Sequence, residues 1–106
     1  MLSETITETY QAAGVIPAAP WRLRALGVLP EWQLAVTFND GLTGIDDVSA
    51  LVNGPDAGVF EELRAPAFFG KAYLDCGAIT WPNGADLASD EMYKEIRRKG
   101  IYRIPD

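Results

Sequence analysis

The chain has 106 residues, enough for one small domain, and its 15 acidic and 9 basic residues give a formal net charge of −6. This acidity disfavours nonspecific binding to nucleic acid or to an anionic membrane, because both depend on positive charge. Histidine is absent and Cys76 is the only cysteine, which excludes Ser-His and Cys-His dyads, histidine-ligated metals and an intramolecular disulfide.

Residues 1–20 are expected to form an N-terminal arm that leads into a single domain at residues 21–106. Prolines at positions 17 and 20 favour an extended chain there. The first ten residues, MLSETITETY, are acidic and polar, unlike a signal peptide. No apolar run approaches the roughly 20 residues that span a bilayer. Since a lone cysteine also fits a reducing compartment, we expect a cytoplasmic protein.

The first part of the domain predicts an antiparallel meander. Residues 21–29 and 32–38 are strand candidates, and in the second of them Leu34, Val36 and Phe38 alternate with more polar residues. Pro30 marks the turn between these strands. Asp40-Gly41 is a hairpin signal, because these residues tolerate the positive φ angles of a tight turn. Residues 42–46 would then form the returning strand.

The middle of the chain predicts short helices and a second hairpin. Asp47 is placed to cap a helical turn over residues 48–52. Residues 59–64, VFEELR, predict a short helix with Val59, Phe60 and Leu63 facing inward. Residues 71–81 predict a hairpin that turns near residues 75–77.

The last part of the chain predicts a turn and the clearest helix. Trp81-Pro82-Asn83-Gly84 fits a four-residue turn with proline at its second position. The helix over residues 90–99 would be capped by Ser89 or Asp86 and would stop at Gly100. The predicted fold is therefore α+β: a small antiparallel sheet, made of the meander and the second hairpin, with short helices and a C-terminal helix.

Three segments, in order, resemble the bacterial family known as domain of unknown function 2442 (DUF2442). They are LAVTFNDG followed by IDDVSALV, then GVFEELRAPAFF, and finally AITWPNGADLASDEMY, the most specific of the three. Together they cover roughly residues 21–96. The chain departs from the family in its longer N-terminal arm and in Ser89, where the family commonly has a proline.

The resemblance implies a small α+β domain and carries no established activity. Members of the family stand alone or are fused to a helix-turn-helix, and some are encoded beside a small toxin-like partner. The resemblance therefore implies a regulatory or antitoxin-like role. We expect no added DNA-binding domain after Pro105.

Two clusters of charged residues allow a functional and a structural interpretation. Acids near the final motif could perform acid–base catalysis or bind a hard cation, but capping and the helix dipole already account for acids there. A basic cluster near the C-terminus could contact nucleic acid, but it also complements the helix dipole. We favour the structural interpretation of both. The acids are Asp86, Asp90 and Glu91, with Asp46 and Asp47 further off, and the bases are Lys94, Arg97, Arg98, Lys99 and Arg103.

A small-ligand pocket near the WPNG motif is a further possibility, with Trp81, Asn83, Asp86 and Tyr93 as its candidate binding residues. Trp81 and Asn83 are more simply explained as a core residue and a turn residue. The ring of Tyr93 belongs to the inner face of the helix, although its hydroxyl needs a partner.

The leading functional hypothesis is a non-enzymatic interaction or regulatory module, with the antitoxin-like member of a two-gene pair as its specific form. The partner would be a basic protein encoded by a neighbouring gene. The alternative is a small-ligand-binding domain with its pocket near WPNG, and an acid hydrolase using Asp86 is the least favoured reading. We expect no catalytic residue, metal or cofactor. We also expect a homodimer, because pairing two sheet edges across a two-fold axis protects them.

Overall fold

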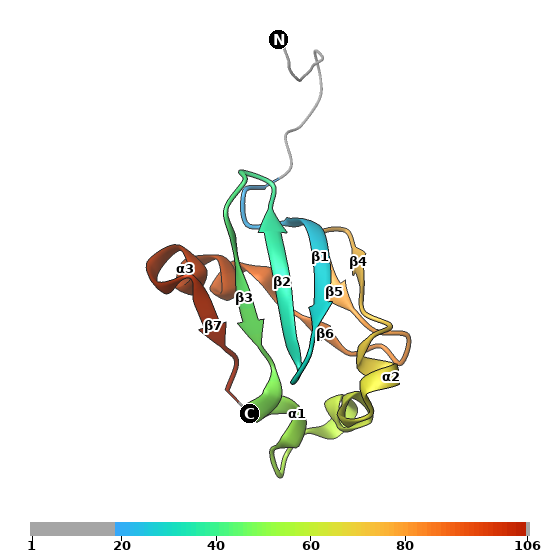
Figure 1. Cartoon of the computed structure of the whole chain (residues 1–106). Coiled ribbons are helices and arrows are strands. Elements are labelled where there is room, and N and C mark those ends of the chain that lie inside the picture. The colour runs from blue at the N-terminus through green and yellow to red at the C-terminus, as the bar shows by residue number, and fades with distance from the viewer. Residues whose placement is uncertain (1–18, 106) are drawn as a thin grey trace.

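The computed structural model describes residues 19–105, and its first three strands form the predicted meander (Figure 1). Strand β1 spans Leu23–Leu29, β2 spans Gln33–Phe38 and β3 spans Thr43–Asp47, and neighbours pair antiparallel. Leu34, Val36 and Phe38 of β2 are all buried, as their alternation predicts. Of the expected arm at residues 1–20, all but the last two residues lie outside the described part of the chain.

A fourth strand, β7 (Ile101–Arg103), lies beside β3 and runs parallel to it, so the sheet order is β1-β2-β3-β7. The sequence analysis missed this strand and described the sheet as antiparallel throughout. Parallel neighbours need a long crossover connection, and here the crossover includes everything from Asp47 to Ile101. A strand of three residues at the end of such a crossover leaves no local pattern to detect.

The second sheet consists of three short strands: β4 (Tyr73–Asp75), β5 (Ala78–Thr80) and β6 (Asp86–Leu87). The predicted hairpin between β4 and β5 is confirmed, with its turn at Cys76 (φ 52°) and Gly77 (φ 80°). The WPNG turn connects β5 to β6. Its Gly84 N–H donates to the Trp81 carbonyl at 3.0 Å, which is the bond that closes a four-residue turn.

Three short helical elements follow β3: α1 (Ser49–Asn53), the 3₁₀ helix η1 (Gly58–Arg64) and α2 (Pro66–Phe69). Asp47 accepts hydrogen bonds from the backbone N–H (3.1 Å) and the hydroxyl (2.7 Å) of Ser49, as the prediction requires, but the N-cap is Val48 and α1 starts one residue later than expected. The prediction for η1 is partly wrong, because Leu63 is buried but Val59 is 48% exposed. A 3₁₀ helix has three residues per turn, so a position four before Leu63 does not share its face.

The C-terminal helix α3 spans Ser89–Lys99. Neither Ser89 nor Asp86 caps it: the residue before the helix is Ala88, which makes no side-chain bond to the helix end. Ser89 is instead the first helical residue, a position that favours proline, and this explains how serine can replace the family's proline. The predicted stop is confirmed, since Gly100 has φ 80° and its N–H donates to the Ile96 carbonyl.

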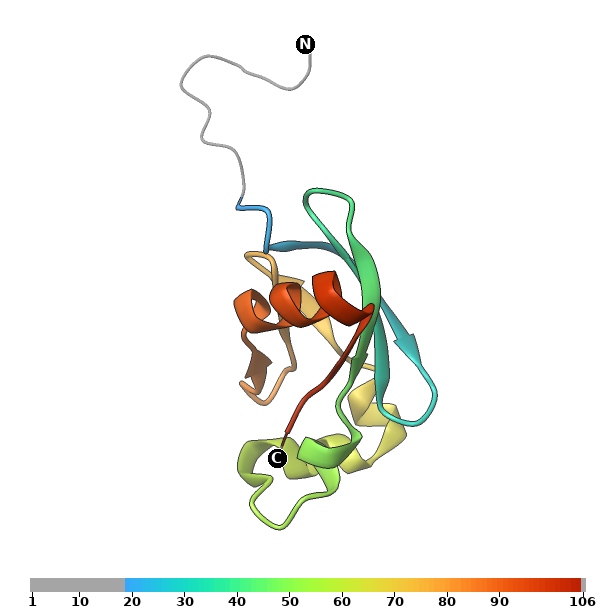
Figure 2. The same cartoon turned by 90° about the vertical axis from the view of Figure 1, so that its left-hand side faces the viewer.

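Helix α3 and the second sheet lie on the same side of the four-stranded sheet (Figure 2). None of the other described elements covers the opposite side of that sheet. The core therefore forms between β2, α3 and the second sheet, and it continues towards α1, η1 and α2. Its fully or nearly fully buried members include Leu34, Phe38, Val52, Leu63, Phe69, Ile79, Trp81, Met92 and Ile96.

Gly44 lets α3 approach β3, and its replacement by alanine tests this packing. A Cβ at Gly44 would overlap the Ile96 side chain and lie 2.9 Å from the Gly100 carbonyl oxygen, whereas a Cβ at Gly27 would meet only the Ala35 Cβ at 3.7 Å. We expect Gly44→Ala to lower the free energy of unfolding by about 1–3 kcal/mol. The matched control Gly27→Ala should cost less than about 0.5 kcal/mol. Urea denaturation followed by circular dichroism measures both, and equal effects would contradict the close helix–strand contact.

Candidate functional site

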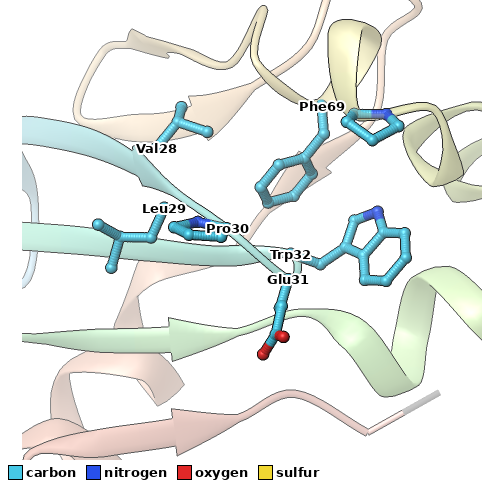
Figure 3. A pocket seen from close by; sticks show the side chains of 7 residues that line it. Val28, Leu29, Pro30, Glu31, Trp32 and Phe69 are labelled. Carbon is cyan, nitrogen blue, oxygen red and sulfur yellow. The ribbon is translucent and has the colours of Figure 1, made fainter.

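An apolar cavity of about 320 Å³ lies between the β1–β2 hairpin and α2 (Figure 3). We call it the hairpin groove. Glu31 is the one charged residue of its lining, and that residue is exposed. The groove is lined by Val28, Leu29, Pro30, Glu31, Trp32, Pro66 and Phe69.

The hairpin turn that forms one wall has an unusual backbone. Glu31 (φ 60°) and Trp32 (φ 57°) are both in the left-handed region, which costs a non-glycine residue roughly 1–2 kcal/mol. Two long-range bonds hold this conformation. The Trp32 indole N–H donates to the Leu63 carbonyl of η1 at 2.8 Å, and the Trp32 carbonyl accepts from the Val48 N–H at 2.9 Å. The rest of the fold therefore fixes the turn in place.

The opposite wall is α2, which is held from behind by Trp81. The indole N–H of Trp81 donates to the Phe69 carbonyl at 2.9 Å, and the two rings lie 5.7 Å apart between centroids. Trp81 itself is fully buried. Both walls of the groove are thus anchored by an indole hydrogen bond, so the groove is formed before any ligand arrives.

Val28 lies at the mouth of the groove and is 44% exposed. It belongs to β1, the terminal strand of the four-stranded sheet. An exposed aliphatic side chain beside an apolar cavity is typical of a surface that binds another molecule. The sequence analysis missed this site, because the groove joins residues 28–32 to residues 66–69, which only the tertiary fold brings together.

The four predicted ligand-binding residues occupy two separate places. Trp81, Asn83 and Asp86 lie in the β5–β6 hairpin, and Asp86 is exposed. The Asn83 amide donates to the Val59 carbonyl (3.0 Å) and to the Glu62 carboxylate (2.9 Å), and its side-chain oxygen accepts from the Ala85 N–H. The polar groups of Trp81 and Asn83 are therefore already used within the chain.

Tyr93, the fourth predicted residue, lies on α3 and packs edge-on against Phe38. Its hydroxyl donates to the Asp40 carboxylate. This bond is the largest cause that lowers the pKa of Asp40 and also the largest that raises the pKa of Tyr93. Tyr93 lines a second cavity, of about 310 Å³, together with Trp21, Asp90 and Lys94.

The basic cluster is largely paired with acids of the same chain. Arg98 and Lys99 approach Glu95 at 2.9 Å and 3.8 Å, and Lys94 lies 4.0 Å from Glu91. Arg103 lies 4.0 Å from Asp47. The bases in these pairs are exposed, and each pair is weak. Four of the five bases nevertheless have an acidic partner within the domain.

Within residues 19–105, no group of three or more histidine, cysteine or acidic side chains is arranged to hold a metal ion. The same residues include no helix that is long and apolar enough to cross a membrane.

Asp46 is the most unusual charged residue of the described chain. Its side chain is 0% exposed, and neither carboxylate oxygen has a hydrogen-bond partner among residues 19–105. Burial raises the pKa of this carboxyl from 3.8 to about 7. The sequence analysis listed Asp46 only as a peripheral acid. The strand alternation could have placed it, because Asp46 pairs with Leu34 and so shares the buried face of the sheet.

Comparison with known proteins gives one result. A family model described as "Protein of unknown function (DUF2442)" matches residues 23–98. No curated protein and no solved structure shows significant similarity to the chain.

The buried Asp46 predicts a distinctive dependence of stability on pH. Because its pKa is higher in the folded chain, the folded state binds more protons than the unfolded state between about pH 4 and pH 7. The free energy of unfolding should therefore fall as the pH rises through this window. We expect Asp46→Asn to be more stable than the wild type at pH 8, by at most about 4 kcal/mol, and the difference should shrink towards pH 4.

Urea denaturation at pH 4, 6 and 8 measures this difference. The matched control is Asp56→Asn, which changes an exposed loop acid and should follow the wild type at every pH. A stability gain for Asp46→Asn that does not vary with pH would show that Asp46 is not buried as a titrating acid.

Proposed function

The chain belongs to the DUF2442 family, and from this premise we propose that it is a non-enzymatic interaction domain whose hairpin groove binds a segment of a partner protein. In its specific form, the domain is the regulatory, antitoxin-like member of a two-gene pair in a bacterial cytoplasm. The partner is then the protein encoded by the neighbouring gene.

The hairpin groove is the observation that carries this proposal. It is concave, apolar and open at Val28, which are the features of a surface that accepts the side chains of another molecule. Its two walls are held by the indole bonds of Trp32 and Trp81. A groove that is already ordered loses little conformational entropy on binding, and this favours affinity.

The charge of the domain indicates the chemistry of the partner. Glu31 is the one acidic residue of an otherwise apolar lining, its carboxylate points away from Phe69 and Trp32 (Figure 3), and the whole chain has a net charge of −6. The complementary ligand is an apolar segment that carries lysine or arginine beside its buried side chains. Opposite charge speeds the encounter and suppresses wrong partners more than it adds affinity.

Self-association belongs to the same proposal. The four-stranded sheet ends in β1 on one side and in the three-residue β7 on the other. Such edges present unpaired backbone groups that a second copy can cover. The proposed complex accordingly contains two copies of each protein, related by a two-fold axis.

A small-ligand-binding domain is the second candidate, and the cavity at Tyr93 favours it. An exposed indole (Trp21), a hydroxyl, an acid and a base meet there, which suits a small amphiphilic molecule that carries both charges. Such a ligand would raise the melting temperature, because it binds only the folded state. A thermal-shift screen with amino acids and related metabolites tests this candidate, and the absence of any shift would argue against it.

Val28 provides the direct test of the groove. The chain should be co-expressed with the product of its neighbouring gene and purified as a complex, and the dissociation constant should be measured by calorimetry. We expect Val28→Arg to weaken binding at least about tenfold, because it puts a cation into an apolar groove and repels a basic segment. Val59→Arg is the matched control: Val59 is also about half exposed but lies outside the groove.

Three outcomes would overturn parts of this proposal. If no complex forms with the neighbouring product, the two-gene form is wrong. Equal weakening by Val28→Arg and Val59→Arg would remove the groove as the binding site. Light scattering of the complex that shows one copy of each chain would exclude the dimer.

A further inference from the structure

Asp46 is the second-last residue of β3, where it pairs with Leu34 of β2 on one side and with Tyr102 of β7 on the other. Its side chain shares the inner face of the sheet with that of Leu34, is 0% exposed and has no hydrogen-bond donor for either oxygen among residues 19–105. A neutral carboxyl tolerates this place far better than an ionised one, because a buried charge without a partner is expensive.

The groups around Asp46 offer no compensating charge. From β2 it faces Leu34, which is apolar, and from β7 it faces Tyr102, which is half buried. Burial is the largest cause that raises the pKa of Tyr102, followed by the nearby carboxylates of Glu91, Glu95, Asp46 and Asp90. Three of these acids, Asp90, Glu91 and Glu95, lie on α3, so this helix adds negative charge near Tyr102. Burial is the only cause of the raised pKa of Asp46, so no base in the described chain offsets it.

Four of the five bases of the C-terminal region have other partners, and the fifth, Arg97, is exposed and its charge acts on Asp40 and Tyr93. Arg98 and Lys99 pair with Glu95, and Arg103 approaches Asp47, which neighbours Asp46 in β3 and therefore points to the opposite face. Among residues 19–105 no base is placed to stabilise the ionised Asp46, so its stabilisation requires access to water. Some element must then move away from the carboxylate.

Strand β7 is the element that can move at the lowest cost. It has three residues, lies at the edge of the sheet and pairs with β3 at three positions only. Beyond it, the Ile104 N–H donates to the Asp47 carbonyl at 2.9 Å. By contrast, β2 is bonded along its length to both β1 and β3. Short edge elements with few backbone bonds open first in native proteins.

We propose that Asp46 is the latch of a conformational switch: loss of its proton detaches β7 and Ile104 from β3 and exposes the β3 edge. The protonated carboxyl keeps the strand closed, and the ionised carboxylate favours the open state, in which water reaches it. This switch is separate from the hairpin groove and does not depend on the proposed function.

The switch operates near neutral pH. Because burial brings the pKa of Asp46 to about 7 in the closed state, against 3.8 ordinarily, the opening constant should rise about fiftyfold in total between pH 5 and pH 7. Above about pH 7 the rise should level off, since Asp46 is then ionised in both states.

Amide hydrogen exchange measured by NMR tests the switch in the full chain. The probe is the Ile104 amide, and the reference is the Phe38 amide, which donates to the Leu42 carbonyl at 2.8 Å in the β2–β3 hairpin. Protection factors correct for the intrinsic pH dependence of exchange. In the wild type we expect the Ile104 protection factor to fall about fiftyfold from pH 5 to pH 7 and to stay well below that of Phe38 at each pH, because release of β7 needs less free energy than unfolding of the whole domain.

Two variants complete the test. In Asp46→Asn the Ile104 protection factor should stay constant over the same range, and in the control Asp56→Asn it should fall as in the wild type. A constant Ile104 value in the wild type would overturn the switch, as would an unchanged fall in Asp46→Asn. Equal protection factors at Ile104 and Phe38 would also overturn it, because they would indicate unfolding of the whole domain rather than release of β7.

Discussion

Two indole N–H groups hold the segment from η1 to α2 against the two sheets, and the candidate binding surface depends on them. Trp32 reaches the Leu63 carbonyl from the first hairpin, and Trp81 reaches the Phe69 carbonyl from the second sheet. A buried carbonyl without a hydrogen-bond donor costs about 1–3 kcal/mol. Each indole N–H supplies that donor, and the bond holds the indole ring in one orientation. The groove exists because hydrogen bonds hold both η1 and α2, the two ends of this segment, in place. The strained backbone at Glu31 and Trp32 is tolerated for the same reason.

Strand β3 connects the other features of the molecule. Gly44 admits α3, Asp46 is the buried acid at the seam with β7, and Asp47 braces α1. The next residue, Val48, donates its backbone N–H to the Trp32 carbonyl. One short strand thus joins the helix packing, the proposed switch and the turn that lines the groove. The unpaired carboxyl is the point where the sequence departs from good core packing, and such departures often have a functional reason.

Local turn chemistry explains what the sequence predicts well. Asp40-Gly41, Cys76-Gly77 and Gly84 set three of the four hairpin turns, and Gly100 sets the end of α3. What the sequence did not predict is non-local. Strand β7 has its partner more than 50 positions away, as its register with β3 shows, and the groove joins two distant segments. Of the predicted ligand residues, Trp81 and Asn83 act within the fold, while Tyr93 lines a cavity apart from the WPNG motif.

The most direct test of the proposed binding surface uses the three tryptophans of the chain as reporters. Trp32 lines the hairpin groove, Trp21 lines the cavity at Tyr93, and Trp81 is buried behind α2. In a ¹⁵N-labelled sample, each indole N–H gives its own NMR signal, and these signals can be followed while the neighbouring gene product is added. The account predicts that the Trp32 signal moves and the Trp21 signal stays. Movement of the Trp21 signal with an unchanged Trp32 signal would contradict it.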